Sequence, residues 1–179
     1  GMCGIAGIIT FDGAQVDQAQ LDVLIDALAH RGPNGRGTYV HGSVGLAQRR
    51  LSVLDLSDAA SQPMISSDGK TVLVFNGEIY NFAEKRRMLE DRGHVFHSTG
   101  DTEVLLKLYE EFGPQCVDHL RGMFAFAVHD LKRGIVFLAR DRVGKKPLKY
   151  FSDGKVFAFA SELKALRTLP SCPKSMDAE

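Results

Sequence analysis

Short apolar runs separated by turn-forming residues recur along the chain and predict β-strands. They cover residues 5–9, 44–46, 71–75, 123–128, 135–139, 149–151 and 156–160. The polar segment 130–134 connects one pair of runs, as in a β-hairpin. Asp153-Gly154 connects another pair and favours a hairpin with a type I′ turn. Because the later runs have no helical segment between them, we expect their strands to pair antiparallel.

Helical spacing of apolar residues appears mainly in the first two thirds of the chain. After residue 20, apolar residues recur at i, i+3 and i+4, namely Leu21, Leu24, Ile25 and Leu28. Asp17 is a suitable N-cap for this helix. Residues 82–92 predict a polar surface helix. Asp101 is the expected N-cap of a further helix that ends at Gly113, and Glu162 lies at the start of a short last helix.

The predicted elements define an α+β fold, in which helices cover antiparallel sheet. Several apolar runs show no polar alternation, so their strands are expected to be buried on both faces, as in two stacked sheets. Residues 30–37 are rich in glycine and other helix breakers and predict a loop. We assign residues 1–169 to one domain and residues 170–179, which have little to pack, to a tail or the start of a linker.

The composition excludes several classes of partner. Among 179 residues, 22 Lys and Arg balance 22 Asp and Glu, so no net charge draws the chain to nucleic acid or to a membrane surface. No apolar run approaches the ~20 residues needed to span a bilayer. The 3 cysteines are widely spaced, which indicates reduced thiols in the cytoplasm rather than disulfides or zinc ligands. The histidines lack metal-ligand spacing, so we expect no metal.

Cys3 is the first candidate for chemistry because of its place in the chain. Met2 is expected to be the initiator methionine, and Gly1 before it the remnant of a cleaved tag. Removal of Met2 would leave Cys3 with a thiol nucleophile and a free α-amine on one residue. The ordinary pKa of such an amine is about 7.7–8, so the amine can act as the base that activates the thiol. The alternative is a small buried residue that begins a strand.

Further positions carry groups that acyl-transfer chemistry needs, and each has a simpler interpretation. The Asn76 side chain and the Gly77 backbone N–H could bind an oxyanion, although Asn-Gly is also typical of a hairpin turn. Arg50 could hold a carboxylate through two hydrogen bonds, or it could be a solvated surface residue. Asp101 could receive an ammonium group, or act only as an N-cap. Each position alone leaves both interpretations open.

Taken together, the motifs of the chain resemble the glutaminase domain of class II glutamine amidotransferases. The resemblance is greatest to the N-terminal domain of glutamine-hydrolysing asparagine synthetases. The shared motifs follow the family order over nearly the whole chain. They are MCGIAG at 2–7, HRGP at 30–33, RLSV at 50–53, QP at 62–63, NGEIYN at 76–81, GDTE at 100–103, LRGMFAF at 120–126, ARDRVGKKPL at 139–148 and FASELKAL at 159–166.

The resemblance implies a fold and a reaction. The fold is a four-layer α/β/β/α sandwich of the N-terminal-nucleophile hydrolase type, in agreement with the stacked sheets expected from the strand pattern. The reaction is hydrolysis of L-glutamine to L-glutamate and ammonia through a cysteine thioester, with no cofactor in this domain. Cys3 would be the nucleophile, its α-amine the proton shuttle, and Asn76 and Gly77 the oxyanion hole.

The resemblance also implies how the substrate is held. Arg50 would bind the α-carboxylate of glutamine. Asp101, helped by Glu78, would bind the α-ammonium group. The loop over residues 31–36 resembles the family's mobile lid. The remaining pocket residues implied by the family are Leu51, Ser52, Val53 and Leu54.

The chain departs from the family pattern at positions that carry none of the assigned chemistry. The departures leave open the subfamily and the way in which the loops close. They are Asn34, Gln48, Gly100 and Lys149.

A synthetase domain is expected to follow this one in the parent protein. Its ATP-binding Ser-Gly-Gly-Xaa-Asp-Ser motif does not occur here. We therefore expect the chain to be the glutaminase part of a longer enzyme, whose synthetase domain uses ATP and Mg and receives the ammonia. A homodimer is compatible with this arrangement. The ammonia acceptor stays open: aspartate, a sugar acid or another carboxylate.

Two expectations concern activity. A non-catalytic scaffold with a regulatory or assembly role is the alternative function, but such a scaffold would be expected to lose at least one site residue. In the chain as written, Gly1 and Met2 precede Cys3, so the amine of Cys3 is tied up in an amide and the pocket is obstructed. We therefore expect this form to be inactive and the form that begins at Cys3 to be active.

Overall fold

The structure, a computed structural model, describes residues 3–32, 35–50, 61–144 and 146–176. Helices and strands alternate irregularly within these ranges. In chain order they are β1 (Gly4–Thr10), α1 (Gln18–Asp26), β2 (Gly35–His41), β3 (Val44–Arg50), β4 (Met64–Ile65), β5 (Thr71–Ile79), α2 (Phe82–Asp91), α3 (Asp101–Phe112), the 3₁₀ helix η2 (Gly113–His119), β6 (Gly122–Asp130), β7 (Ile135–Arg140), β8 (Lys149–Ser152), β9 (Val156–Ala160) and α4 (Leu163–Leu166).

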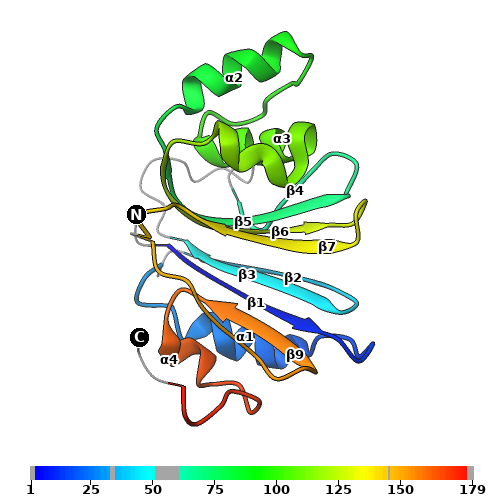
Figure 1. Cartoon of the computed structure of the whole chain (residues 1–179), viewed down its shortest axis with the longest axis vertical. Helices are drawn as coiled ribbons and strands as arrows, with labels where there is room; N and C mark the ends of the chain where they lie inside the picture. Colours follow the sequence, from blue (N-terminus) through cyan, green and yellow to red (C-terminus); the bar gives the residue numbers. More distant parts are fainter. Residues whose placement is uncertain (1–2, 33–34, 51–60, 145, 177–179) are drawn as a thin grey trace.

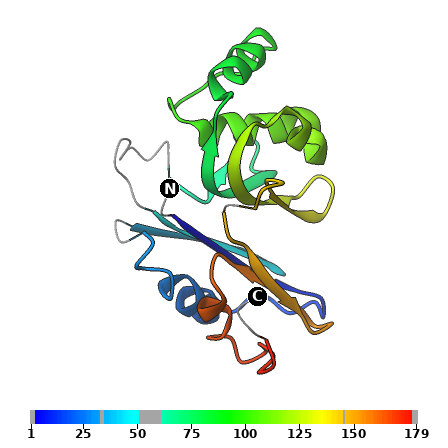
Figure 2. The ribbon, with the colours of Figure 1, turned by 60° about the vertical axis from the view of Figure 1, so that its left-hand side comes forward.

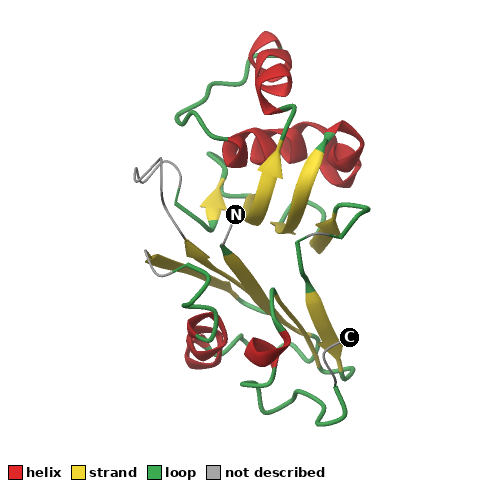
Figure 3. Cartoon of the chain, turned by 90° about the vertical axis from the view of Figure 1, so that its left-hand side faces the viewer, coloured by secondary structure: helices red, strands yellow, loops and turns green. Residues whose placement is uncertain are grey.

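Two antiparallel sheets stack face to face. The first sheet has the strand order β2-β3-β1-β9-β8, and the second has the order β4-β5-β6-β7. Figure 1 shows α1 and α4 outside the first sheet and α2 and α3 outside the second, and the helices stay outside the sheets in the turned views of Figures 2 and 3. The expected four-layer α/β/β/α sandwich is therefore confirmed.

The alternation of side chains in each strand divides the apolar core into separate layers. In β1, Ile5 and Ile9 pack between the two sheets, whereas Ala6 and Ile8 pack on the side of α1. A third layer lies between the second sheet and α3, where Phe126 is fully buried. Burial of one large apolar side chain contributes roughly 1.5–3 kcal/mol, so β1 is stabilised by packing on both of its faces.

The first helix forms as its sequence predicts. The Asp17 side chain accepts a hydrogen bond from the N–H of Ala19 at 2.8 Å, which satisfies one free donor of the first turn of α1. α3 also ends where expected, at Gly113 with φ 63°. The expected N-cap of α3 is wrong, because Gly100 is the N-cap and Asp101 is the first helical residue. The Asp101 carboxylate instead accepts the N–H of Ile79, at the end of β5.

Other local expectations are also wrong. The expected loop over residues 30–37 gives way at Gly35 to β2, which pairs with β3 along its whole length. Asp153-Gly154 forms a hairpin but no type I′ turn, because Asp153 does not adopt the positive φ that this turn requires. The Asp153 carboxylate accepts the N–H groups of Lys155 and Val156 and so stabilises a different turn.

The described part of the tail packs on the domain. Cys172 and Met176 lie against the core layer between the first sheet and α1. The Arg167 guanidinium donates a hydrogen bond to the carbonyl of Met176 at 2.9 Å. The boundary at residue 169 stays a prediction, but residues 170–176 have more to pack than their composition indicated.

Candidate active site

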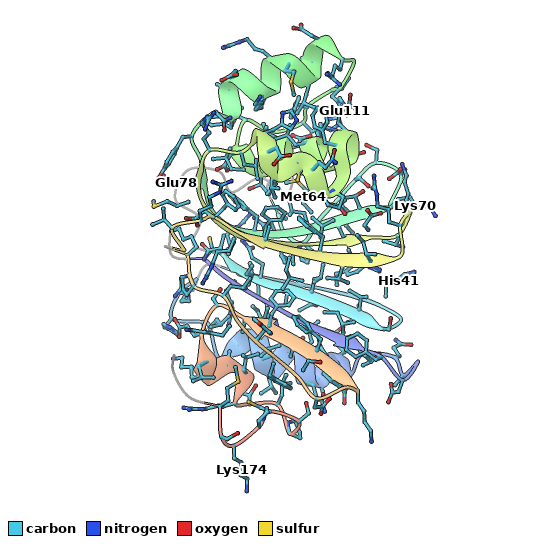
Figure 4. All side chains as sticks on the ribbon, viewed as in Figure 1. His41, Met64, Lys70, Glu78, Glu111 and Lys174 are labelled. Atoms are coloured by element: carbon cyan, nitrogen blue, oxygen red, sulfur yellow. The ribbon has the colours of Figure 1, made fainter. Side chains whose placement is uncertain are left out.

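The elements that carry the candidate residues meet at one end of the sandwich. β1 begins and β5 ends at this end (Figure 1), and Figure 4 shows Glu78 there, at the opposite end from His41. β1 and β3 are antiparallel neighbours, with Gly4 opposite Arg49. Extending this register by one residue places Cys3 opposite Arg50.

Three candidate side chains lie on the faces that the two sheets turn toward each other. In β1 the inter-sheet face contains Ile5, so the alternation extends this face to Cys3. In β3 it contains Leu46, and the same alternation places Arg50 on it. In β5 the residues at 72 and 74 pack between the sheets, which places Asn76 there as well. Pairing and alternation thus assign a thiol, a guanidinium and an amide to the facing surfaces of the two sheets.

Buried polar atoms without a partner gather at this end. Asn76 is fully buried, yet neither its Nδ2 nor its Oδ1 has a hydrogen-bond partner among the described residues. Arg50 Nη1 and Arg49 Nε are also buried without a hydrogen-bond partner in the described part of the chain. An unsatisfied buried polar group costs about 1–3 kcal/mol, so such groups are rare outside functional sites. Asn76 is also not in a turn, since it lies within β5.

Gly77 occupies a position where only glycine fits. Its φ is 145°, and a Cβ built there would lie 2.1 Å from the carbonyl oxygen of Met123 on the paired strand β6. A substitution would push β5 away from β6 and move Asn76 with it. The close approach of the two backbones therefore fixes the geometry around residues 76 and 77.

Asp101 and Glu78 make this end of β5 negative. Burial raises the pKa of Asp101, and the Glu78 charge adds to this effect, although the hydrogen bond from Ile79 at 2.9 Å acts in the opposite direction. Glu78 is exposed at the end of the strand. A partly buried carboxylate beside a second one provides a suitable environment for a cation.

The cysteines differ in what their environments allow. Cys116 is fully buried, and burial raises the pKa of its thiol to about 12, so it stays an unreactive thiol at neutral pH. Burial also raises the pKa of Cys172. Cys3 is partly exposed, and its carbonyl oxygen accepts a hydrogen bond from Arg31 Nε at 3.2 Å. Of the cysteines, Cys3 alone lies among the candidate residues.

Sequence reasoning missed a buried glutamine beside Arg50. Gln48 is 2% exposed, and it lines a small cavity of about 80 Å³ together with Arg50, Arg36 and Gln62. Its alternation with Leu46 and Arg50 in β3 is the signal that would have revealed it. The expected pocket residues Leu51, Ser52, Val53 and Leu54 lie outside the described residues, as does Asn34.

The described ranges hold no cluster that resembles a metal site. Within residues 3–32, 35–50, 61–144 and 146–176, no three His, Cys, Asp or Glu side chains come together as metal ligands would. None of the helices in the same ranges is long and apolar enough to cross a membrane.

The structure is therefore an α/β/β/α sandwich with a cysteine directly before β1, the central strand of its first sheet. The sequence profile of the glutamine amidotransferase domain matches residues 2–179. The chain therefore belongs to the glutamine amidotransferase domain family.

Individual relatives agree with this assignment. The chain is 42% identical over 179 residues to asparagine synthetase [glutamine-hydrolyzing] 3 of Bacillus subtilis, with 98% of this chain and 29% of that protein covered. It is 39% identical over 175 residues to asparagine synthetase B of Escherichia coli, with 96% and 30% covered. The chain thus spans about three tenths of the length of these relatives.

A solved structure shares the fold. The glutamine phosphoribosylpyrophosphate amidotransferase of B. subtilis superimposes with a TM-score of 0.77 at 22% identity, over 93% of this chain and 43% of that one. At this identity the likeness concerns the fold alone.

Proposed function

We propose that this domain hydrolyses L-glutamine to L-glutamate and ammonia, with Cys3 as the nucleophile. The proposal rests on two buried groups, the Asn76 amide and Arg50 Nη1, which have no hydrogen-bond partner among the described residues. Strand alternation assigns both to the inter-sheet faces, as it does Cys3. A zwitterionic amide substrate supplies the partners that these groups lack. Membership of the glutamine amidotransferase domain family supports the same reaction.

The reaction proceeds in two steps at Cys3. The α-amine of Cys3 takes the thiol proton as Sγ attacks the carboxamide carbon of glutamine. Asn76 Nδ2 and the N–H of Gly77 bind the oxyanion of the tetrahedral intermediate. The ammonium form of the amine returns the proton to the leaving nitrogen, and ammonia departs. Water then hydrolyses the γ-glutamyl thioester, which releases glutamate and restores the thiol.

Charged groups hold the two ends of the glutamine backbone. Arg50 binds the α-carboxylate, and a guanidinium is suited to this task because it can donate two parallel hydrogen bonds. Asp101 binds the α-ammonium group, and the charge of Glu78 assists it. Leu51, Ser52, Val53 and Leu54 stay predicted pocket residues through their match to the family motif, and they lie outside the described residues.

A free amine at Cys3 is required for this chemistry. While Gly1 and Met2 precede it, the amine is part of a peptide bond and cannot carry the proton. The chain that begins at Gly1 is therefore inactive, and the chain that begins at Cys3 is active.

The test is glutamate release by the two forms, with a Cys3→Ala variant as the control. We expect turnover only from the form that begins at Cys3 and a loss of at least about 10³-fold in Cys3→Ala. Equal rates from both forms contradict the role of the α-amine. A Cys3→Ala variant with full activity contradicts the role of the thiol, and no activity in any form favours a non-catalytic scaffold.

The ammonia passes to a synthetase domain in the parent protein. The relatives named as glutamine-hydrolysing asparagine synthetases are about three times as long as this chain, which leaves room for such a domain. ATP and Mg act in that domain, where a carboxylate acceptor is activated. The proposed compartment is the cytoplasm, where the free cysteines of this domain stay reduced, and a homodimer is compatible with this proposal.

A further inference from the structure

The junction after β9 holds the start of β1 in place. Ser161, fully buried, donates its backbone N–H to the carbonyl of Ile5 at 2.9 Å. Its Oγ accepts the N–H of Ile5 at 2.9 Å. The backbone of Ile5 is therefore fixed at both its donor and its acceptor, two residues after Cys3.

Glu162 extends this contact toward Cys3 through its side chain. Its Oε2 accepts a hydrogen bond from Arg31 Nη1 at 3.0 Å, and His30 Nε2 lies 2.9 Å from the same oxygen. The Arg31 guanidinium also donates from Nε to the Cys3 carbonyl at 3.2 Å. The side chains of Arg31 and Glu162 are only 14% and 26% exposed, so solvent screens this pair less than a surface ion pair.

The helix that Glu162 precedes does not require a glutamate. Glu162 is the N-cap of α4, but its side chain makes no capping hydrogen bond, and shorter side chains are the usual caps. Partial burial acts to raise the pKa of its carboxyl, but the hydrogen bonds from Arg31 and His30 outweigh this and keep the pKa below its ordinary value. The carboxylate is therefore ionised at neutral pH and available to Arg31.

We propose that Glu162 is a positioning residue for the nucleophile, which orients Arg31 so that Arg31 fixes the Cys3 carbonyl and with it the thiol and the α-amine. The inference rests on the proposed role of Cys3 and adds a residue that acts on it from the opposite end of the chain.

Cys3 needs such support because regular sheet pairing ends next to it. The ladder between β1 and β3 begins with Gly4 opposite Arg49, and residues beyond the last pair of a ladder tend to fray. A displacement of about 1 Å at a reacting group can cost on the order of 100-fold in rate. Arginine suits the task at position 31, because its planar guanidinium presents Nε and Nη1 in a fixed geometry to two acceptors.

The first experiment compares steady-state glutaminase kinetics of variants in the form that begins at Cys3. We expect Glu162→Ala to lower kcat by about 10- to 100-fold with KM for glutamine within twofold, because Arg50 and Asp101 still hold the substrate. Glu162→Gln keeps an oxygen acceptor and should recover part of this loss. Glu84→Gln is the matched control, since Glu84 is 70% exposed and has only a long contact of 3.9 Å to Lys85.

The second experiment tests whether Glu162 acts through Arg31. In an Arg31→Lys background, where one group can no longer reach both acceptors in the same geometry, Glu162→Gln should change kcat by less than twofold. If Glu162→Gln lowers kcat in the Arg31→Lys background as much as it does with Arg31 present, Glu162 does not act through Arg31. Thermal unfolding of each variant accompanies the kinetics, and a loss of kcat that follows only the unfolded fraction shows a merely structural role and overturns the inference.

The outcomes separate this inference from the proposed function. If the unsubstituted form that begins at Cys3 has no glutaminase activity, the proposed function fails and the inference fails with it. If that form is active and Glu162→Ala matches it in kcat, only the inference fails. A rise in KM with unchanged kcat also overturns it, because that result assigns Glu162 to substrate binding.

Discussion

The two ends of the β5–β6 ladder differ in the hydrogen bonding of a buried polar side chain. At one end Asp130 is 1% exposed, and its carboxylate accepts hydrogen bonds from the Tyr109 hydroxyl at 2.8 Å, the Arg133 backbone at 3.0 Å and Arg133 Nη1 at 2.9 Å. At the other end Asn76 is 0% exposed, and its amide has no partner among the described residues. The first arrangement stabilises the fold, and the second agrees with the proposed role of Asn76 in binding a substrate.

The difference shows where this domain accepts an energetic penalty. Hydrogen bonds from Arg133 and Tyr109 overcome the effect of burial and lower the pKa of Asp130, so its charge is compensated. In the same strand pair, the polar atoms of Asn76 have no hydrogen-bond partner among the residues that the structure describes. Natural proteins tolerate such local conflicts mainly at functional sites.

The largest expected effect is on the rate, at Asn76. Asn76→Ala should lower kcat for the proposed glutamine hydrolysis by about 10²–10³-fold, because the proposed oxyanion hole loses its side-chain donor. The free energy of unfolding should change by less than about 1 kcal/mol, since the Asn76 amide has no hydrogen-bond partner in the described part of the chain. Glutaminase kinetics and urea unfolding measure the two quantities. A large loss of stability with normal kcat would show that the Asn76 amide has a structural role. The contrast between Asn76 and Asp130 would then be wrong.

The next effect is on stability, at the other end of the ladder. Asp130→Ala should reduce the free energy of unfolding by about 3 kcal/mol, because hydrogen bonds to a charged group contribute roughly 1.5–3 kcal/mol each and the buried Tyr109 hydroxyl loses its acceptor. The kcat per folded molecule should stay unchanged. Chemical unfolding at low temperature gives the first value, and an activity measured under the same conditions gives the second. Loss of kcat in fully folded Asp130→Ala would contradict the separation of the two ends.

The smallest effect is a pH dependence at Asp101. In the proposed site, Asp101 binds the ammonium group of glutamine only when it is ionised. Burial, together with the Glu78 charge, raises the pKa of Asp101. KM for glutamine should therefore be constant at high pH and rise severalfold as pH falls through the pKa of Asp101, beginning above the ~3.9 of an ordinary aspartate. Asp130, whose pKa is lowered, keeps its charge over this range. Asp101→Asn should show a high KM without this dependence, and an unchanged pH profile in that variant would exclude Asp101 as the titrating group.

The sequence predicted most strands and helices because their apolar patterns are buried on the expected faces. It missed β2, because Gly35 and Gly37 look like loop residues when read locally. Tertiary contact explains the strand: a Cβ at Gly37 would lie 1.9 Å from the carbonyl oxygen of Gln62, so glycine is needed for close approach and not for a turn. The expected cap at Asp101 failed for a similar reason, since its carboxylate binds the distant N–H of Ile79.

For the site, the motifs supplied a set of candidates but not their arrangement. That Cys3, Arg50 and Asn76 share the inter-sheet space depends on the register of β1 with β3 and on the stacking of the second sheet, and neither can be obtained from local patterns. The support from Glu162 was equally hidden. Its motif was recognised, but a contact with Arg31 across 131 positions of the chain is visible only in three dimensions.

The two hydrogen bonds between Ser161 and Ile5 have a consequence for biosynthesis. The bonded residues are 156 positions apart, and β1 is completed in its sheet only when β9 is present beside it. A ribosome therefore releases almost the entire domain before the strand that follows Cys3 gains its second neighbour. We therefore expect that an incomplete chain, which has Cys3 but no β9 beside β1, cannot yet carry out the proposed hydrolysis.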